Sequence, residues 1–198
     1  MNIENQQEYF SKTFDGLDVG GSHLSEVIFE GCAFLRCNFS EVSFYKCKFV
    51  ECTFTASNLS NVVVSHSKFL DVDFHESKVI GIDWTKADWP RFSFSAPFKF
   101  TECILNDSSF FGLNFTELTA EHCKAHDVDF RNGNFSKANF SYTDFAHSLF
   151  LKTNLKEADF SEAQNYSINI FENEIAGARF SRYEAISLLD CLNIELVD

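Results

Sequence analysis

Cysteine is the residue type in this chain whose spacing first suggests chemistry. Cys32 and Cys52 are twenty residues apart, as are Cys103 and Cys123, and thiolates at a fixed spacing are typical zinc ligands. However, the sequence holds no Cys-x-x-Cys pair, and its seven cysteines are an odd number without a secretion signal. We therefore predict reduced thiols that fill small positions in the core, with Cys191 packed or free in a terminal helix.

Two histidines suggest a second site. His122 and His126 lie near Glu121 and Asp127, and the four have the composition of a metal-binding or acid–base set. The repeat described below places them on a corner and on the adjacent wall, so we do not expect them to converge. The sequence also lacks a Gly-x-Ser-x-Gly turn, a phosphate-binding glycine loop, a zinc-protease motif and a dinucleotide fingerprint. We predict a protein that is not an enzyme and that needs no metal and no cofactor.

Acidic side chains are the strongest functional candidates. Lys and Arg number 16 against 29 Asp and Glu, which gives a net charge of −13 with neutral His. The negative charge of the protein repels phosphate groups, so we expect no direct binding to nucleic acid or to an anionic membrane. We expect instead a partner that is basic or that normally binds a polyanion. For any single carboxylate, the alternative is a charge that only keeps the protein soluble. The candidate surface consists of Asp71, Asp73, Glu76, Asp83, Asp88, Asp107, Asp127, Asp129, Asp144 and Asp159.

A repeat of five residues positions these side chains. Every fifth residue from Leu24 to Trp89 is large and apolar, with a small or β-branched residue two places before it. After a one-residue slip within residues 90–99, the repeat resumes at Phe100, and Ile170, Ile175 and Phe180 continue it beyond one polar residue, Asn165. Most of the 25 phenylalanines hold the large position. The predicted core ladder includes Phe29, Phe34, Phe39, Phe44, Phe49, Phe54, Phe130, Phe135, Phe140, Phe145 and Phe150.

The period selects the secondary structure. A step of five on an α-helix turns by about 140°, which would spread the Phe side chains around every side. In an extended segment, residues two apart share a face, but five is odd, so the chain must bend once per repeat to keep each pair inside. Asn or Asp often precedes the large residue, as in Asn38-Phe39 and Asp159-Phe160, and such side chains bond to nearby backbone at tight corners. We therefore predict an all-β coil with an apolar interior.

The pattern A(D/N)LXX, here mostly with Phe at its centre, resembles the pentapeptide-repeat proteins over residues 17–180. The resemblance implies an all-β solenoid, a right-handed quadrilateral β-helix with four repeats per coil and with a short C-terminal α-helix and strand. The implied organisation is an N-terminal segment or cap (1–16), the β-helix (17–180, with the slip at 90–99) and a C-terminal dimerisation part (181–198). Members of the family have unrelated roles, so the fold alone does not fix the function.

The C-terminal end narrows the resemblance. Ser181-Arg182-Tyr183-Glu184 has the pattern of a helix capping box, Tyr183 to Leu192 has helical spacing, and Ile194 to Val197 is typical of a strand. From Asn173 onward this end is similar to that of the Qnr quinolone-resistance proteins, in which the helix and strand pair two chains end to end. The resemblance implies a homodimer whose interface contains Tyr183, Ile186, Leu189, Leu192, Ile194 and Leu196.

The size and charge of the rod can be compared with those of DNA. About 8 coils at about 4.8 Å each give roughly 40 Å, and an end-to-end dimer gives roughly 80 Å. Duplex DNA of that length carries about 47 charges, against 26 for two chains of −13 each. Together with the Qnr resemblance, this predicts a non-catalytic DNA mimic that binds a bacterial type II topoisomerase, DNA gyrase or topoisomerase IV, and modulates it or protects it from quinolones.

Two further expectations accompany this hypothesis. Qnr proteins that protect gyrase carry loops between coils, whereas the slip around Pro90 to Pro97 is the only interruption here, which implies topoisomerase contact without drug protection. The alternative is an acidic pentapeptide-repeat scaffold that binds another basic protein, or only itself; scattered acidic patches would favour it, and a continuous stripe would favour mimicry. With no leader at Met1 and no run of about 18 apolar residues, we expect a soluble, cytoplasmic protein.

Overall fold

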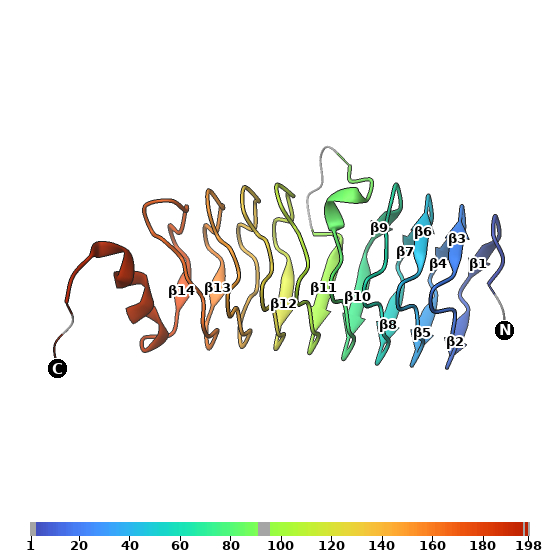
Figure 1. Cartoon of the computed structure of the whole chain (residues 1–198), viewed down its shortest axis with the longest axis horizontal. Helices are drawn as coiled ribbons and strands as arrows, with labels where there is room; N and C mark the ends of the chain where they lie inside the picture. The colour runs from blue at the N-terminus through green and yellow to red at the C-terminus, as the bar shows by residue number, and fades with distance from the viewer. Residues whose placement is uncertain (1–2, 91–95, 196, 198) are drawn as a thin grey trace.

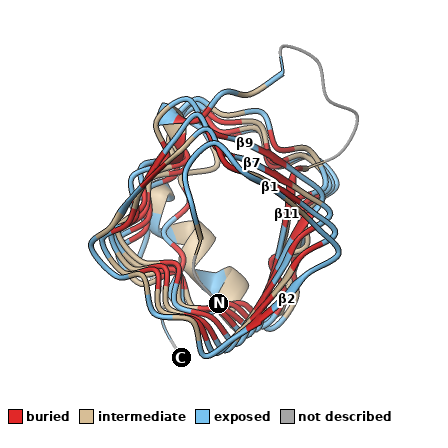
Figure 2. Cartoon of the chain, turned by 90° about the vertical axis from the view of Figure 1, so that its right-hand side faces the viewer, coloured by how far each residue is buried: buried red, intermediate tan, exposed pale blue. Residues whose placement is uncertain are grey.

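The chain forms a right-handed β-helix that extends as a rod from the N-terminus to a C-terminal helix (Figure 1). The structure is a computed structural model that describes residues 3–90, 96–195 and 197. Viewed along the rod, each coil has four sides, and buried residues recur on all of them (Figure 2). The predicted fold is therefore confirmed. Within the described residues, no helix is both long and apolar enough to span a bilayer.

Parallel strands join the coils. The first side carries β1 (Glu8–Phe10), β4 (Ile28–Glu30), β7 (Lys48–Val50) and β9 (Lys68–Leu70). The second side carries β2 (Thr13–Asp15), β5 (Ala33–Leu35), β8 (Thr53–Thr55), β10 (Val72–His75), β11 (Phe98–Thr101) and β12 (Thr119–Glu121), and further along β13 (Asp159–Phe160) and β14 (Arg179–Phe180). The third side has isolated bridges such as Asn38 to Asn58, and the fourth carries β3 (His23–Ser25) and β6 (Ser43–Tyr45). Residues twenty apart are paired, as four repeats of five require.

Asn and Asp side chains form many of the corners, as predicted. The Oδ1 atom of Asn38 accepts a hydrogen bond from the Ser40 N–H at 3.1 Å, and Asn58 and Asn139 accept the equivalent bonds. Asp73 differs because it lies inside β10. The corner that follows places a residue such as Glu41 in the left-handed region at a φ of 58°. Most corner residues are not glycine, and each of these corners costs about 1–2 kcal/mol of backbone strain.

Aromatic rings fill the interior. The Phe34 ring stacks on those of Phe14 and Phe54 in the neighbouring coils, with centroids 5.1 and 4.5 Å apart. All eleven phenylalanines of the predicted core ladder are buried, which confirms this part of the sequence analysis. Side-chain contacts of this kind recur on every side, so the coil is a packed column and not a channel.

The small inward position carries a second ladder, made of hydrogen bonds. The hydroxyl of Ser57 accepts the Cys37 N–H at 3.0 Å and donates to the Phe34 carbonyl at 3.2 Å. Cys37 donates its thiol to the Phe14 carbonyl at 3.4 Å in the same way. The six cysteines of the repeat are buried and free, which confirms the prediction of core thiols. Burial raises the pKa of Cys52 to about 11, so this thiol stays protonated at neutral pH.

The slip after Trp89 is larger than the sequence phase suggested. Phe74 pairs with Phe100, twenty-six residues on, whereas Phe54 pairs with Phe74 at the ordinary spacing of twenty. One coil is therefore six residues longer than its neighbours, and the extra residues enter between Trp89 and Pro97 at the corner between the first and second sides. The expectation of a one-residue interruption was wrong in length because one and six give the same phase. A 3₁₀-helix, η1 (Trp84–Lys86), immediately precedes this insertion (Figure 1).

The N-terminal boundary of the β-helix also differs from the prediction. β1 and β2 already pair with β4 and β5, so the coil begins near residue 8 and not at 17. Tyr9 stacks on Phe29 at 5.4 Å, and Phe14 stacks on Phe34. These two residues were left out of the repeat although they lie at ladder positions, five residues apart.

The last coil departs from the regular phase. Asn165 does not point inward: its side chain is exposed and donates a hydrogen bond to Asp144 at 2.8 Å. Tyr166 is buried in its place, and Ile168 pairs with Phe150 and is buried instead of the predicted Ile170, which is half-buried. The phase thus moves by two residues at Ile168 and returns to the spacing of twenty at Glu174, which pairs with Asn154.

The C-terminal part is helical, but its details correct the sequence analysis. The helix η2 (Glu184–Leu192) has 3₁₀ geometry and begins after Tyr183 without a side-chain cap. Ser181 is not a capping residue, because its hydroxyl donates to Glu162 at 2.8 Å. No strand forms at Ile194, Glu195 or Val197 among the described residues, and Leu196 lies outside them.

Candidate functional site

The ten predicted acidic residues are distributed over the whole circumference of the rod. Asp88 lies on the first side, Asp73 and Asp159 on the second, Asp144 on the third, and Asp83 and Asp129 on the fourth. Asp71, Glu76, Asp107 and Asp127 are corner residues with positive φ. Asp107 and Asp127 stack at one corner as predicted, but the set as a whole does not form one stripe.

Three of these carboxylates stabilise the fold itself. Asp129, Asp144 and Asp159 are half-buried, and each accepts the backbone N–H two residues ahead, at 2.9 to 3.1 Å. Each also has a basic partner: Arg131 at 2.8 Å from Asp129, His126 at 2.8 Å from Asp144, and Arg179 beside Asp159. Their charges are therefore partly used inside the protein.

The same contacts determine the protonation of these three groups. Partial burial raises the pKa of each carboxyl, but the hydrogen bonds and the positive charge of the partners outweigh burial. The pKa of Asp129, Asp144 and Asp159 is consequently lower than that of an ordinary aspartate. All three remain charged well into the acidic range.

The other seven carboxylates are exposed. Asp83 lies 3.6 Å from Lys86, Asp88 lies 3.6 Å from His66, and Glu76 lies 3.9 Å from His75. Such long, solvent-exposed pairs contribute little energy. Asp71, Asp73, Asp107 and Asp127 form no ion pair with any residue that the structure describes. These seven are the charges available to a partner.

One corner of the rod concentrates acidic residues, and the sequence analysis missed most of them. The corner between the first and second sides carries Glu51, Asp71, Glu117 and Glu157, with Lys137 as the one basic residue among these five corner positions. We call these four carboxylates the acidic ridge. Each residue of the ridge lies two places after a large inward residue. This shared position in the repeat is the sequence feature from which the ridge could have been predicted. The insertion after Trp89 interrupts the ridge at the same corner.

The predicted histidine set does not converge. His122 stacks flat on Tyr142, with ring centroids 4.4 Å apart, at the corner between the second and third sides. His126 lies on the third side and pairs with Asp144. A different group is brought together instead: ligand atoms of His75, Glu76 and Glu102 lie within 4.8 Å of one another. The regular spacing of twenty residues does not predict this group, because Glu76 and Glu102 are separated by the longer coil.

Four of the six predicted dimer residues are exposed near the C-terminal end. Tyr183 is 85% exposed, Ile186 51% and Ile194 55%, whereas Leu189 is half-buried. Leu192 is also exposed, and Leu196 lies outside the described residues. Val197 and Phe171 are also exposed, at 85% and 72%.

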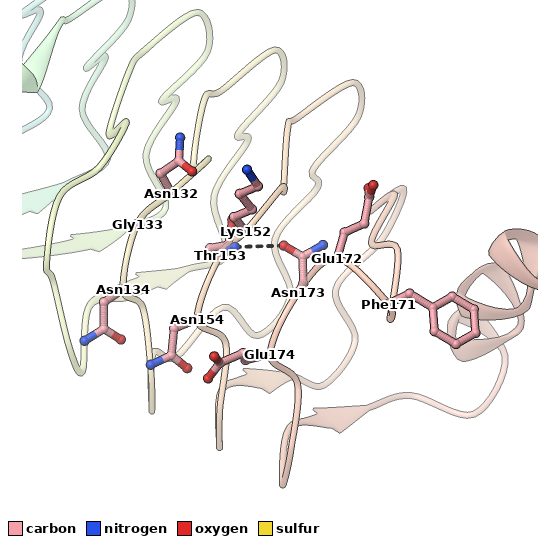
Figure 3. A pocket seen from close by; sticks show the side chains of 10 residues that line it. All are labelled: Asn132, Gly133, Asn134, Lys152, Thr153, Asn154, Phe171, Glu172, Asn173 and Glu174. Carbon is pink, nitrogen blue, oxygen red and sulfur yellow. Dashed lines mark hydrogen bonds between the residues drawn. The ribbon is translucent and has the colours of Figure 1, made fainter.

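A surface hollow of about 470 Å³ lies next to this end (Figure 3). Asn173 forms its floor, where its Oδ1 accepts the Thr153 N–H at 3.0 Å and its amide donates to the Phe150 carbonyl at 3.1 Å. The Thr153 hydroxyl donates to the Phe130 carbonyl. The polar atoms of Asn173 and Thr153 are thus already paired with the backbone of the wall. The Thr153 hydroxyl donates to a backbone carbonyl and not to a side chain that could act as a general base.

Comparisons with known proteins agree with this architecture. A family model described as a pentapeptide repeat region matches residues 27–98 and 93–160. No curated protein matches the sequence. A trypsin-treated variant of QnrB1, described as a plasmid-mediated fluoroquinolone resistance protein, is 17% identical, with a TM-score of 0.62 over 98% of this chain and 99% of that one.

Two more solved structures are similar. Full-length QnrB1 is 18% identical, with a TM-score of 0.53 over 96% of this chain and 99% of that one. HetL, a pentapeptide repeat protein involved in heterocyst differentiation regulation in the cyanobacterium Nostoc sp. strain PCC 7120, is 15% identical, with a TM-score of 0.59 over 88% and 84% of the two chains. At these identities the likeness concerns the fold.

Proposed function

The chain belongs to the pentapeptide-repeat family, and from that premise we propose that it is a non-catalytic DNA mimic. In this proposal the rod binds a bacterial type II topoisomerase, DNA gyrase or topoisomerase IV, in place of DNA, and modulates it or protects it from quinolones. The observation that supports the proposal most is the combination of a straight, solid rod with a net charge of −13. A basic DNA-binding surface attracts such a rod at long range.

The acidic ridge is the part of the surface that we assign to the topoisomerase. Glu51, Asp71, Glu117 and Glu157 project from one corner, so they can follow one groove of a partner. The insertion between Trp89 and Pro97 enters at the same corner and makes that coil six residues longer than its neighbours. The half-buried carboxylates on the other sides contribute less, because they already hold Arg131, His126 and Arg179.

Supercoiling assays with purified gyrase test this proposal. We expect the protein to compete with DNA and, in the presence of ciprofloxacin, to change the amount of cleaved DNA. A variant with Glu51→Gln, Asp71→Asn, Glu117→Gln and Glu157→Gln should lose the effect, because it removes four charges from the ridge. The control carries Glu41→Gln, Asp107→Asn and Asp127→Asn at another corner and should retain it. No binding and no protection at micromolar protein would reject the proposal.

We also propose that two chains pair end to end through the apolar C-terminal surface around Tyr183, Ile186 and Ile194. Pairing would bury side chains that are otherwise more than half exposed. Light scattering after size-exclusion chromatography should give the mass of a dimer for the full chain. Truncation after Phe180 should give monomers or aggregates because it opens the last coil. A stable dimer of the truncated chain would refute this pairing.

The placement of the acidic residues also favours a second candidate, a scaffold that binds another basic protein. The ten predicted carboxylates are spread over all four sides, as expected of a solubilising surface. The fold also occurs in HetL, which is described as involved in heterocyst differentiation regulation. Equal loss of gyrase binding in the ridge variant and in its control would indicate nonspecific charge attraction and would favour this candidate.

A further inference from the structure

We propose that His75, Glu76 and Glu102 form a zinc site at the corner between the second and third sides. The Nε2 atom of His75 lies 3.9 Å from Oε1 of Glu76, and one ligand atom from each of the three residues lies within 4.8 Å of the other two. This group lies outside the acidic ridge and outside the C-terminal surface. Glu76 belongs to the ten predicted acidic residues but not to the acidic ridge, so zinc binding can be tested separately from the topoisomerase proposal.

The backbone brings these residues together through its parallel register. β10 ends at His75 and β11 ends at Thr101, and these two residues are paired. Glu76 and Glu102 therefore follow their strands at equivalent places and adopt the same left-handed corner conformation, with φ of 48° and 56°. The Glu76 N–H donates to the Thr101 carbonyl at 3.1 Å, and the Glu102 N–H donates to the Glu121 carbonyl at 3.0 Å. The Cα positions of the three ligands are thus set by a rigid ladder.

The chemistry of the three side chains selects zinc over calcium and magnesium. One imidazole nitrogen and two carboxylate oxygens suit a borderline metal, whereas Ca²⁺ and Mg²⁺ prefer oxygen ligands alone. Zinc binds such atoms at about 2.0–2.2 Å in tetrahedral geometry, so the side chains must close around it by small rotations. They are free to do so, because the side chains of His75 and Glu76 are 45% and 57% exposed. The fourth position remains open to water.

The electrostatics of the corner also favour a divalent cation. Two stacked glutamates repel each other across neighbouring coils, and a bound cation removes this repulsion. The next residue along the corner, His122, is already stacked on Tyr142. The ligand atoms that lie close together are therefore those of His75, Glu76 and Glu102.

Calorimetric titration of the full-length protein with Zn²⁺ at neutral pH tests the inference. We expect one zinc per chain, with affinity lowered at least about tenfold in His75→Ala and in Glu102→Gln. The matched control is His147→Ala, an exposed corner histidine at φ 61° on another corner, which should bind like the parent. Affinity should also fall on acidification, because the imidazole must be deprotonated to bind.

A competing thiol site must be separated in the same experiment. Cys191 is the cysteine outside the packed core, so Cys191→Ser is titrated in parallel. Zinc binding that disappears in Cys191→Ser, or that is unchanged in His75→Ala, overturns the proposal. Circular dichroism of each variant shows whether the coil is intact, and because the three ligands are solvent-accessible, we expect it to be.

Discussion

The coils before the insertion and the coils after it have the same kind of interior, but the backbone of their sides differs. Before Trp89, strands form on the first, second and fourth sides, whereas the strands after Pro97 all lie on the second side within the described residues. On the first side, Lys48 and Lys68 precede the large residue in the early coils, and Asn134 and Asn154 do so in the late coils. On this side, the residue before the large one therefore differs between the extended early coils and the turned late coils.

The hydrogen bonds explain this difference. Asn134 accepts the Ser136 N–H at 3.1 Å, and the Phe135 carbonyl then accepts the Ala138 N–H at 3.1 Å, which closes a turn. Lys48 and Lys68 at the same place have no acceptor in their side chains, and there the chain is extended and pairs with its neighbour. In the late coils, polar side chains on this side therefore form hydrogen bonds with the backbone of their own turns. This is also why Asp129, Asp144 and Asp159 are less available to a partner than the exposed carboxylates.

Loss of an inward ring should have the largest effect, in both regions. We expect Phe135→Ala to cost about 3–5 kcal/mol of unfolding free energy, as buried Phe deletions do. Phe54→Ala should cost a similar amount, because the stacked contacts of Phe54 with Phe34 and Phe74, at 4.5 and 5.0 Å, and the edge-to-face contacts of Phe135 with Phe130 and Phe110 are both favourable ring arrangements. Urea unfolding measures both. A cost under about 1 kcal/mol for Phe135→Ala would contradict a buried ring.

A smaller effect is expected at Gly133, a small inward position of a late coil that lies against a Phe ring. A Cβ added at Gly133 would meet the Phe135 ring at 2.4 Å, so Gly133→Ala should destabilise the protein by about 1–3 kcal/mol through overpacking. The same small position holds Ser67 in an early coil on the same side, where a larger side chain fits. The double variant Gly133→Ala, Phe135→Leu should recover part of the loss in urea unfolding. A neutral Gly133→Ala would show that the Phe135 ring moves away from the added Cβ without cost, and it would contradict this expectation.

The interior could be predicted from the sequence because every repeat places a large apolar residue at the same position. Phe34, Phe54 and Phe135 share one place in the pentad, and burial of that place does not depend on how many residues a coil contains. The exterior is different, because the side on which a residue lies depends on counting whole coils. A slip of one residue and a slip of six leave Phe100 in the same phase, so the sequence located the insertion but understated its length. The neighbours of Glu102 were hidden for the same reason.

The ends of the rod were the least predictable parts. The capping pattern at Ser181 was plausible locally, but Glu162 from the preceding coil provides a better hydrogen-bond partner for its hydroxyl. Asn165 similarly bonds to Asp144 across coils, and this leaves Tyr166 to occupy the interior. Local sequence patterns cannot include such partners, because these lie about twenty residues away along the chain.

Acidification should distinguish the two regions. The folded state lowers the pKa of Asp129, Asp144 and Asp159, so their contribution to stability is present above the ordinary aspartate pKa of about 3.9 and is lost as pH falls through the lower folded values. We expect hydrogen exchange below about pH 4 to increase first in the late coils. The variant Asp129→Asn, Asp144→Asn, Asp159→Asn retains the turn acceptors and should weaken this pH dependence. Uniform loss of protection along the rod would contradict the expectation.

The smallest effect concerns the strain that the two kinds of corner share. Ala56 follows an extended side with φ 50°, and Lys137 follows a turned side with φ 60°, and both are exposed. Replacing a left-handed residue by glycine relieves about 1–2 kcal/mol of strain but raises the entropy of the unfolded chain, which costs about 0.4–1 kcal/mol. Ala56→Gly and Lys137→Gly should each therefore stabilise the protein by about 0.5–1 kcal/mol.

The reverse substitution provides the control for this prediction. Gly16 lies on the same corner as Ala56, at φ 63°, and an added Cβ there would touch nothing within 4 Å. Gly16→Ala should therefore destabilise the protein by a similar amount through the backbone alone. If Ala56→Gly and Lys137→Gly change the free energy of unfolding in urea equally, the corner strain does not depend on whether the preceding side is extended or turned. A gain at Lys137 only would show that the extended sides relax their corners by other means, and the two regions would then differ in backbone strain as well as in hydrogen bonding.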